Sequence, residues 1–238
     1  YAPAIDLGLV TPANIIDDVP VYMMTTGEDK DKPYPLNYDH NYDGLTTVRN
    51  GLKASINVVA AKIWRDILGP DQSIEYLKKV GINRENEKYL SLVLGGLYEG
   101  MNPLQMAAAY APFANKGLYY EPTTYTRVED SDGNVLLEKR PQFHAAYSET
   151  TAFLMADMMK DVCRYRNNAY PRGGTASSLI REDVIGMPVA GKTGTTSDNV
   201  DKWFVGYTPY YAAATWYGYD NRIKQITLIP EEYNQAQL

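Results

Sequence analysis

Val189-Ala190-Gly191-Lys192-Thr193-Gly194-Thr195-Thr196 is the most informative stretch of this 238-residue sequence, because it sets one lysine and three threonines around two glycines. An ammonium group and several hydroxyls close together are typical of an anion-binding wall. Gly194 has no Cβ, so a ligand could lie directly against the backbone there. The stretch therefore predicts a site for an anionic ligand, and the flanking sequence indicates which kind.

One interpretation is a phosphate loop, because Gly186 to Thr193 also matches the pattern of two glycines followed by lysine and threonine. Such a loop must follow a buried strand and open a helix. Residues 179–185 instead carry three charges, and residues 193–199 favour turns. The sequence favours the other interpretation, an edge strand beside an acylation site with Lys192 facing a carboxylate.

Composition indicates a folded protein with its own hydrophobic core. Hydrophobic residues make up 45% and aromatic residues 12%, which suits one domain or two closely joined lobes. The net charge of −6 and the pI near 5.0 argue against a nucleic-acid partner. No apolar run of 18 or more residues occurs, so no membrane span is expected in this sequence.

The cysteine and histidine content predicts neither a disulfide nor a metal site. Cys163 is the single cysteine, and its helical surroundings favour a packed thiol over a nucleophile. His40 and His144 lack metal-ligand spacing. Asp39 to Gly44 matches the first half of a calcium loop, but Asn50 stands where a bidentate glutamate is required. We interpret that segment as a turn and expect no metal and no cofactor.

Residues 10–44 are rich in Pro, Asn, Asp and Gly, and predict a long surface excursion. A helix is then predicted from Thr46 or Thr47, its candidate N-caps, to Gly69-Pro70. Ser55 and Asn57 lie two residues apart on this helix and would point to different sides of it. They could act as a pair only at a helix end.

Three further helices are expected along the chain. They cover residues 73–80, residues 104–114, which are apolar on nearly all sides and so predict a buried central helix, and residues 149–162, capped by Ser148.

The sequence after Lys192 predicts strands at residues 203–207 and 212–219. Their short connections predict an antiparallel meander, whose faces the earlier helices must cover. A hairpin with strands at 124–128 and 135–138 is expected at the periphery. The expected architecture is a layered α+β fold.

Several short groups of residues occur in order along nearly the whole chain. They are Asn37-Tyr38, Leu52-x-x-Ser55-x-Asn57, Leu92-x-Leu94-Gly95-Gly96, Ala190 to Thr196, and Asp201-x-Trp203-Phe204-Val205-Gly206-Tyr207-Thr208-Pro209. Together they resemble the transpeptidase domain of class A, bifunctional penicillin-binding proteins. The signature of this family is Ser-x-x-Lys, a Ser-x-Asn element and Lys-Thr-Gly. The last two match Ser55-Ile56-Asn57 and Lys192-Thr193-Gly194, whereas Ser-x-x-Lys is not found in this sequence.

The resemblance implies an α+β fold with an antiparallel sheet flanked by helices, as in penicillin-binding proteins and serine β-lactamases. It further implies that the N-terminal strands and the nucleophile helix precede this sequence. Residues 1–238 would then be the C-terminal part of a transpeptidase domain truncated at both ends, with a mostly helical lobe at 45–180 and sheet strands at 189–220.

The implied activity is peptidoglycan cross-linking by a serine-type D-Ala-D-Ala transpeptidase, with the nucleophilic serine upstream. By resemblance, Ser55 relays a proton to the leaving group and Lys192 lowers the cost of charge there. Asn57 positions the substrate amide, and the Thr195 N–H forms half of an oxyanion hole.

The resemblance also implies the substrate-binding residues and the partners. Thr193 and Thr195 would bind the terminal carboxylate, with Gly194 and Thr196 in the same binding strand. The expected partners are an upstream fragment carrying Ser-x-x-Lys, peptidoglycan stem peptides and β-lactam antibiotics, with no nucleic acid. We expect the chain to be poorly folded without that fragment.

The expected location is the extracytoplasmic face of the bacterial membrane, anchored by a segment outside this sequence. Two alternatives stay open. One is a non-catalytic module that binds peptidoglycan, and the other is a penicillin-recognising hydrolase, although no glutamate with a suitable motif for deacylation is evident.

Overall fold

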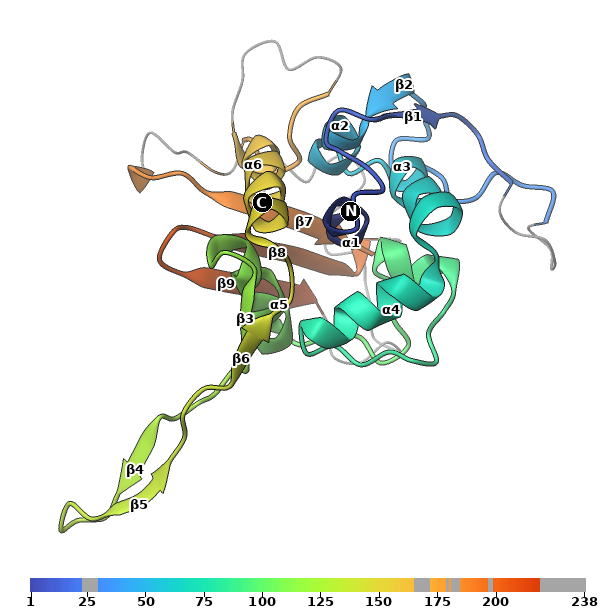
Figure 1. The fold of residues 1–238 in the computed structure, drawn as a ribbon. Coiled ribbons are helices and arrows are strands. Elements are labelled where there is room, and N and C mark those ends of the chain that lie inside the picture. Colours follow the sequence, from blue (N-terminus) through green and yellow to red (C-terminus); the bar gives the residue numbers. More distant parts are fainter. Residues whose placement is uncertain (23–29, 165–171, 179, 181–184, 197–198, 219–238) are drawn as a thin grey trace.

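The lysine stretch forms the first strand of a three-stranded antiparallel sheet. Strands β7 (Ala190–Thr195), β8 (Asp201–Tyr207) and β9 (Ala212–Gly218) lie in the sheet in chain order (Figure 1). The predicted meander is confirmed, and β7 is an edge strand among the described residues. The computed structural model of the chain describes residues 1–22, 30–164, 172–178, 180, 185–196 and 199–218.

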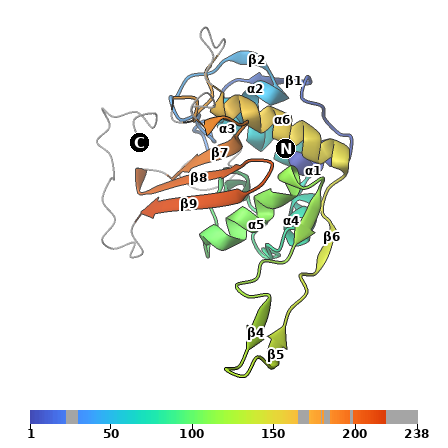
Figure 2. The ribbon, with the colours of Figure 1, turned by 90° about the vertical axis from the view of Figure 1, so that its left-hand side faces the viewer.

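Two helices pack against this sheet. Helix α6 (Glu149–Cys163) contacts β7, and helix α5 (Pro103–Ala114) contacts β8 and β9 (Figure 2). The architecture is therefore the α+β arrangement that the sequence predicts, with β7 held between its partner strand and a helix.

Helix α6 is encoded locally. The Ser148 hydroxyl accepts a hydrogen bond from the Thr151 N–H at 3.2 Å, which confirms the predicted N-cap. Its buried residues recur every three or four positions: Thr151, Ala152, Met155, Met158, Met159, Val162 and Cys163. Cys163 is fully buried, as a packed thiol should be.

Helix α5 is less buried than its composition predicts. Asn102 and Gln105 form a reciprocal capping box at its start. Only Ala109, Pro112 and Phe113 are buried, and Leu104 is 52% exposed. Because one side of α5 packs on the sheet while Leu104 in its first turn is exposed, the expectation of a helix buried on nearly all sides is wrong.

The helix predicted between Thr46 and Gly69 is broken into three pieces. They are α2 (Val48–Lys53), α3 (Asn57–Lys62) and a π-helical segment η1 (Ile63–Leu68), and Thr47 is the N-cap of the first. The break lies at Ser55, whose φ of 57° is left-handed and incompatible with a continuing α-helix. Periodicity alone did not reveal it, since the apolar positions keep their helical spacing across the break.

The N-terminal helix is a short buried turn that contacts α6, η1 and the helix that follows η1. Helix α1 (Ala2–Asp6) lies at the centre of the molecule in Figure 1, with Ala4 fully buried. Helix α4 (Pro70–Lys79) begins three residues before the predicted start, and Leu90–Leu94 forms a 3-10 helix, η2. No helix in the described part of the chain combines the length and the apolar character needed to cross a bilayer.

The described residues of the segment at 10–44 include a strand pair and two buried polar side chains. Strand β1 (Ile15–Asp18) pairs antiparallel with β2 (Gly44–Thr47). Asp18 is fully buried and Asn37 is 2% exposed. The expectation of a purely superficial segment is therefore wrong for these two side chains.

Two further antiparallel strand pairs lie outside the three-stranded sheet, and the second of them extends away from the body of the fold. Strand β3 (Leu118–Tyr120) pairs with β6 (Phe143–Ala145), and β4 (Arg127–Glu129) pairs with β5 (Val135–Glu138). Every residue of β4 and β5 is exposed, and this pair lies at the tip farthest from the sheet (Figure 1). The predicted peripheral hairpin is confirmed.

Candidate active site

Lys192 and Ser55 meet directly although 137 positions separate them in the sequence. Lys192 Nζ donates to Ser55 Oγ at 2.8 Å and to the Thr193 carbonyl at 2.9 Å. Both side chains are half-buried. The edge strand and the broken helix thus place an ammonium and a hydroxyl in one polar cluster.

The environment of Lys192 disfavours its charge. Burial lowers the pKa of Lys192 to about 8, while interaction with Cys163 acts in the opposite direction. The ammonium is therefore easier to deprotonate than that of an ordinary lysine. Its hydrogen-bond acceptors among the described residues are the Ser55 hydroxyl and the Thr193 carbonyl, both uncharged.

The break between α2 and α3 places Ser55 and Asn57 at the end of a helix instead of inside one. Ser55 adopts φ 57°, and Asn57 is the first residue of α3. Asn57 Nδ2 donates to the Leu36 carbonyl at 2.8 Å. The two polar residues therefore sit at a helix end, which is the arrangement that their spacing requires if they act together.

The backbone of β7 directs alternate N–H groups to opposite sides of the strand. The Thr196 N–H donates to the Asp201 carbonyl at 3.2 Å, so it faces β8. Because this orientation alternates along an antiparallel ladder, the Thr195 N–H points to the opposite edge. The Thr193 carbonyl, which alternation also places on that edge, accepts from Lys192 Nζ. Strand β7 therefore presents a backbone donor on the same edge as the Lys192 contact.

The other predicted binding residues lie along the same strand. Thr193 Oγ1 is 2.6 Å from Thr175 Oγ1. Thr196 Oγ1 donates to Asp201 Oδ2 at 3.0 Å, at the turn between β7 and β8.

Gly194 has a packing role that the sequence did not predict. It lies opposite Trp203 in the β7–β8 register, and a Cβ there would be 3.0 Å from the Trp203 Cβ. We interpreted this glycine as an opening for a ligand, whereas the contact with Trp203 gives a second reason for it within the sheet.

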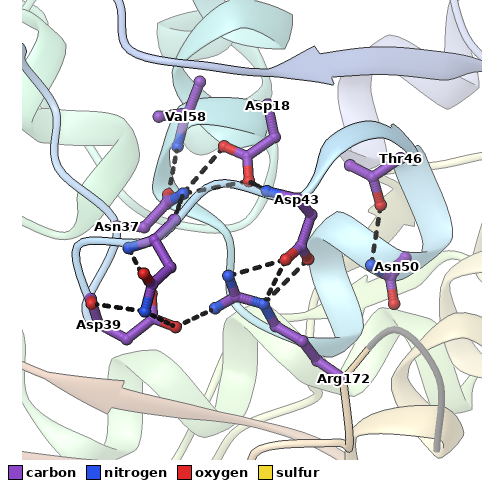
Figure 3. Close-up of polar contacts among 9 residues, drawn as sticks. Asp18, Asn37, Asp39, Asp43, Thr46, Asn50, Val58 and Arg172 are labelled. Atoms are coloured by element: carbon purple, nitrogen blue, oxygen red, sulfur yellow. Dashed lines mark hydrogen bonds and ion pairs between the residues drawn. The ribbon is translucent and has the colours of Figure 1, made fainter.

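Sequence reasoning missed the polar cluster that supports α3, shown in Figure 3. Asn37 Nδ2 donates to Asp18 Oδ1 at 2.9 Å, and Asn37 Oδ1 accepts from the Val58 N–H at 3.2 Å. The Asp43 N–H donates to Asp18 Oδ2 at 2.9 Å. Asn37-Tyr38 was among the groups that carry the family resemblance, but nothing in its neighbours assigned the amide a partner.

Arg172, in the segment before β7, forms hydrogen bonds with the same loop. Arg172 Nε donates to both carboxylate oxygens of Asp43, at 2.8 and 2.9 Å, and Arg172 Nη1 donates to Asp39 Oδ2 at 2.7 Å (Figure 3). The segment that we interpreted as a turn because it lacks a calcium-loop glutamate therefore binds a guanidinium. No group of three or more potential metal-ligating side chains occurs among the residues that the structure describes.

The chain matches the penicillin-binding protein transpeptidase domain over residues 1–222. Penicillin-binding protein 1A of Clostridium acetobutylicum is 40% identical over 229 residues, which cover 94% of this chain and 27% of the relative. Penicillin-binding protein 1F of Bacillus subtilis is 32% identical over 229 residues, covering 88% of this chain and 30% of the relative. The chain spans less than a third of the length of either relative.

A solved structure agrees with these sequence matches. The crystal structure of penicillin-binding protein 1A from Haemophilus influenzae has a TM-score of 0.80 and 25% identity, covering 99% of this chain and 38% of that one. The fold, the matched residues and the similarity to penicillin-binding proteins 1A agree with the resemblance seen in the sequence. The chain therefore belongs to the penicillin-binding protein transpeptidase domain family.

Proposed function

We propose that residues 1–238 are the C-terminal part of a D,D-transpeptidase domain that cross-links peptidoglycan stem peptides. The proposal includes the expected division into a mostly helical lobe at 45–180 and sheet strands at 189–220. The observation that carries it is the 2.8 Å contact between Lys192 Nζ and Ser55 Oγ. That contact joins two elements of the family signature that lie far apart in the sequence.

The reaction requires a nucleophile that this sequence does not supply as Ser-x-x-Lys. We therefore place the acyl-accepting serine in a part of the protein outside residues 1–238. Its oxygen forms an ester with the penultimate D-alanine carbonyl carbon, and the C–N bond to the terminal D-alanine breaks. The serine proton ends on the leaving amine, and an acceptor amine of a second stem peptide then displaces the serine from the ester.

Ser55 and Lys192 are suited to that proton transfer. The Ser55 hydroxyl can donate to the leaving nitrogen while it accepts from Lys192 Nζ, and the ammonium favours the partial negative charge that develops on the oxygen. Asn57, at the start of α3, would position the substrate amide beside them.

Strand β7 supplies the binding edge. The Thr195 N–H is directed away from β8 and would donate to the oxygen of the tetrahedral intermediate. The hydroxyls of Thr193 and Thr195 would bind the terminal carboxylate, with Gly194 and Thr196 completing the strand. β-Lactams carry a carboxylate beside a strained amide, so they would occupy the same edge and acylate the same serine.

This activity places the site where peptidoglycan lies, on the extracytoplasmic face of the bacterial membrane. The anchor and the segment with the nucleophile would belong to a part of the protein outside residues 1–238. The chain covers less than a third of the two relatives, penicillin-binding proteins 1A and 1F.

The test is to label the full-length protein with a fluorescent penicillin and to map the labelled peptide by mass spectrometry. We expect one labelled serine, outside residues 1–238, and a label that persists on the time scale of cell-wall synthesis. Residues 1–238 prepared alone should stay unlabelled.

The alternatives give other results. A label that is released rapidly as hydrolysed penicillin would indicate a penicillin-recognising hydrolase. Retention on immobilised peptidoglycan without any label would indicate a binding module. A labelled serine within residues 1–238 would contradict the placement of the nucleophile.

A further inference from the structure

The side chain of Asn37 uses both ends of its amide inside the fold. It is 2% exposed, and its Nδ2 donates to Asp18 Oδ1 and to the Asn41 carbonyl, both at 2.9 Å. Its Oδ1 accepts from the Val58 N–H at 3.2 Å (Figure 3). The amide therefore connects the loop that carries it to β1 on one side and to α3 on the other.

The Asn37 amide caps the start of helix α3, whose own N-cap residue cannot do so. The first N–H groups of a helix need acceptors, which the N-cap side chain normally supplies to the second or third residue. The N-cap of α3 is Ile56, which has no oxygen to offer, and its side chain makes no capping bond. Asn37 takes its place, because Val58 is the second residue of α3.

Asp18 determines which way the amide faces. Its carboxylate is fully buried, and its two oxygens accept hydrogen bonds from Asn37 Nδ2 and from the Asp43 N–H. The Asn37 amide must therefore present nitrogen to Asp18, which leaves its oxygen for Val58. Reversing the amide would set its oxygen against the Asp18 carboxylate and the Asn41 carbonyl, and would leave the Val58 N–H without its acceptor, which is costly.

The same loop also reaches the β7 side of the site. Arg172 binds Asp39 and Asp43, and three residues later Thr175 contacts Thr193 on β7 through the two hydroxyls. The loop of residues 36–43 is thus linked through Val58 to the helix that follows Ser55, and through Arg172 to the segment that contacts the neighbour of Lys192.

We propose that Asn37, oriented by the buried carboxylate of Asp18, is a positioning residue that holds the first turn of α3 so that Ser55 Oγ stays against Lys192 Nζ. This inference rests on the proposed function, since Ser55 matters only if it passes a proton to a leaving group. None of the hydrogen bonds of Asn37 within the described part of the chain goes to Ser55 or Lys192, so its effect would be indirect.

The chemistry provides a readout that a general loss of folding would not change. An amide or β-lactam nitrogen must be protonated as it leaves, whereas a thiolate leaves without a proton because its pKa is about 8.5. A displaced Ser55 would therefore slow acylation by a β-lactam far more than acylation by a thioester of a D-alanine peptide. Fewer folded molecules would slow both equally.

The experiment measures both acylation rates in the full-length protein, each normalised to the number of sites titrated by penicillin. For Asn37→Asp we expect the β-lactam rate to fall about 10²-fold, as displacements of about 1 Å do, and the thioester rate to fall less than about threefold. The exchanged pair Asp18→Asn/Asn37→Asp keeps one amide facing one carboxylate, and should recover most of the loss. If Asn37→Asp does not fold, Asn37→Ser is measured in the same way, with the same expectation.

The matched control is Asp17→Asn, which removes a charge from the exposed neighbour of Asp18 and should leave the ratio of the two rates unchanged. An unchanged ratio in Asn37→Asp, or an equal change in Asp17→Asn, would overturn the positioning role. Lys192→Ala separates the two proposals. If it too leaves β-lactam acylation unchanged, the proposed function has failed, and if it abolishes acylation while Asn37→Asp changes nothing, only the role of Asn37 has failed.

Discussion

The start of helix α6 is capped by a neighbouring residue, whereas the break at Ser55 between α2 and α3 is contacted by residues from distant parts of the chain. Ser148 caps α6 three positions from its partner. Ser55 is contacted by Lys192 from 137 positions away, and the turn that follows is tied to Leu36 and Asn37 from 21 positions away. The difference suggests that stability and activity depend on separate regions, and the expectations below are ordered by the size of the effect.

The largest effect on the acylation rate is expected from Lys192→Ala, which removes the distant partner of Ser55. Removing the ammonium takes away stabilisation of charge at the leaving group, so the acylation rate of the full-length protein with fluorescent penicillin should fall about 10²- to 10³-fold. The control is Lys202→Ala on the neighbouring strand β8, where the ammonium binds Asn199 instead. Equal losses in the two variants would indicate a general charge effect and contradict the role of Lys192.

A change of pH should separate activity from stability at the same residue. The folded-state pKa of Lys192 is lowered to about 8 from 10.5, first by burial. Above pH 8 the charge is lost, so acylation should fall about tenfold per pH unit. The unfolded chain binds more protons between pH 8 and 10.5, so this residue's contribution to stability rises over that range. The pH–rate profile of Lys192→Arg, which keeps its charge, should lack this alkaline fall; an unchanged profile would assign the fall to another group.

The left-handed backbone at Ser55 gives a smaller and purely structural effect. Ser55→Gly and Ser55→Ala both remove the hydroxyl, but alanine at a φ of 57° is strained by about 1 kcal/mol. The glycine variant should therefore have the higher thermal midpoint. At Ala54, where φ is −90°, glycine should lower the midpoint instead. The same sign at both positions would contradict the strained turn.

The smallest effect is expected at the N-cap of helix α6. Ser148→Ala removes the N-cap of α6 and should reduce stability by about 1 kcal/mol, as seen by thermal unfolding. The acylation rate per titrated site should stay unchanged, and Ser148→Thr should restore the stability. A large loss of rate per site would show that α6 and the site are more closely coupled than the contacts imply.

The sequence predicted what local chemistry encodes. The cap and the apolar spacing of α6, the meander around Lys192 and the exposed hairpin all follow from residues close together in the chain. The family resemblance also placed Ser55 and Lys192 in one signature before any geometry was known. In the structure these two side chains are in contact, and their roles stay a proposal.

What the sequence did not predict depends on contacts between distant segments. Apolar spacing continues through Ser55, so it cannot signal a break that is held from residues 36 and 37. Asp18 and Asn37 lie in a polar segment whose composition predicts a surface position. Their hydrogen bonds to each other and to the Asp43 and Val58 N–H groups make their burial favourable. Likewise, the value of a glycine at position 194 depends on Trp203, which β-pairing brings opposite it.

The central claim is that Ser55 and Lys192 act as one unit, and a double-mutant cycle tests it most directly. The acylation rate of the full-length protein by a β-lactam would be measured for Ser55→Ala, Lys192→Ala and the double variant. We expect the double variant to be within about threefold of the slower single variant, because removing either partner disables the same proton transfer. Losses that multiply would mean that the two residues act independently, and would contradict the account.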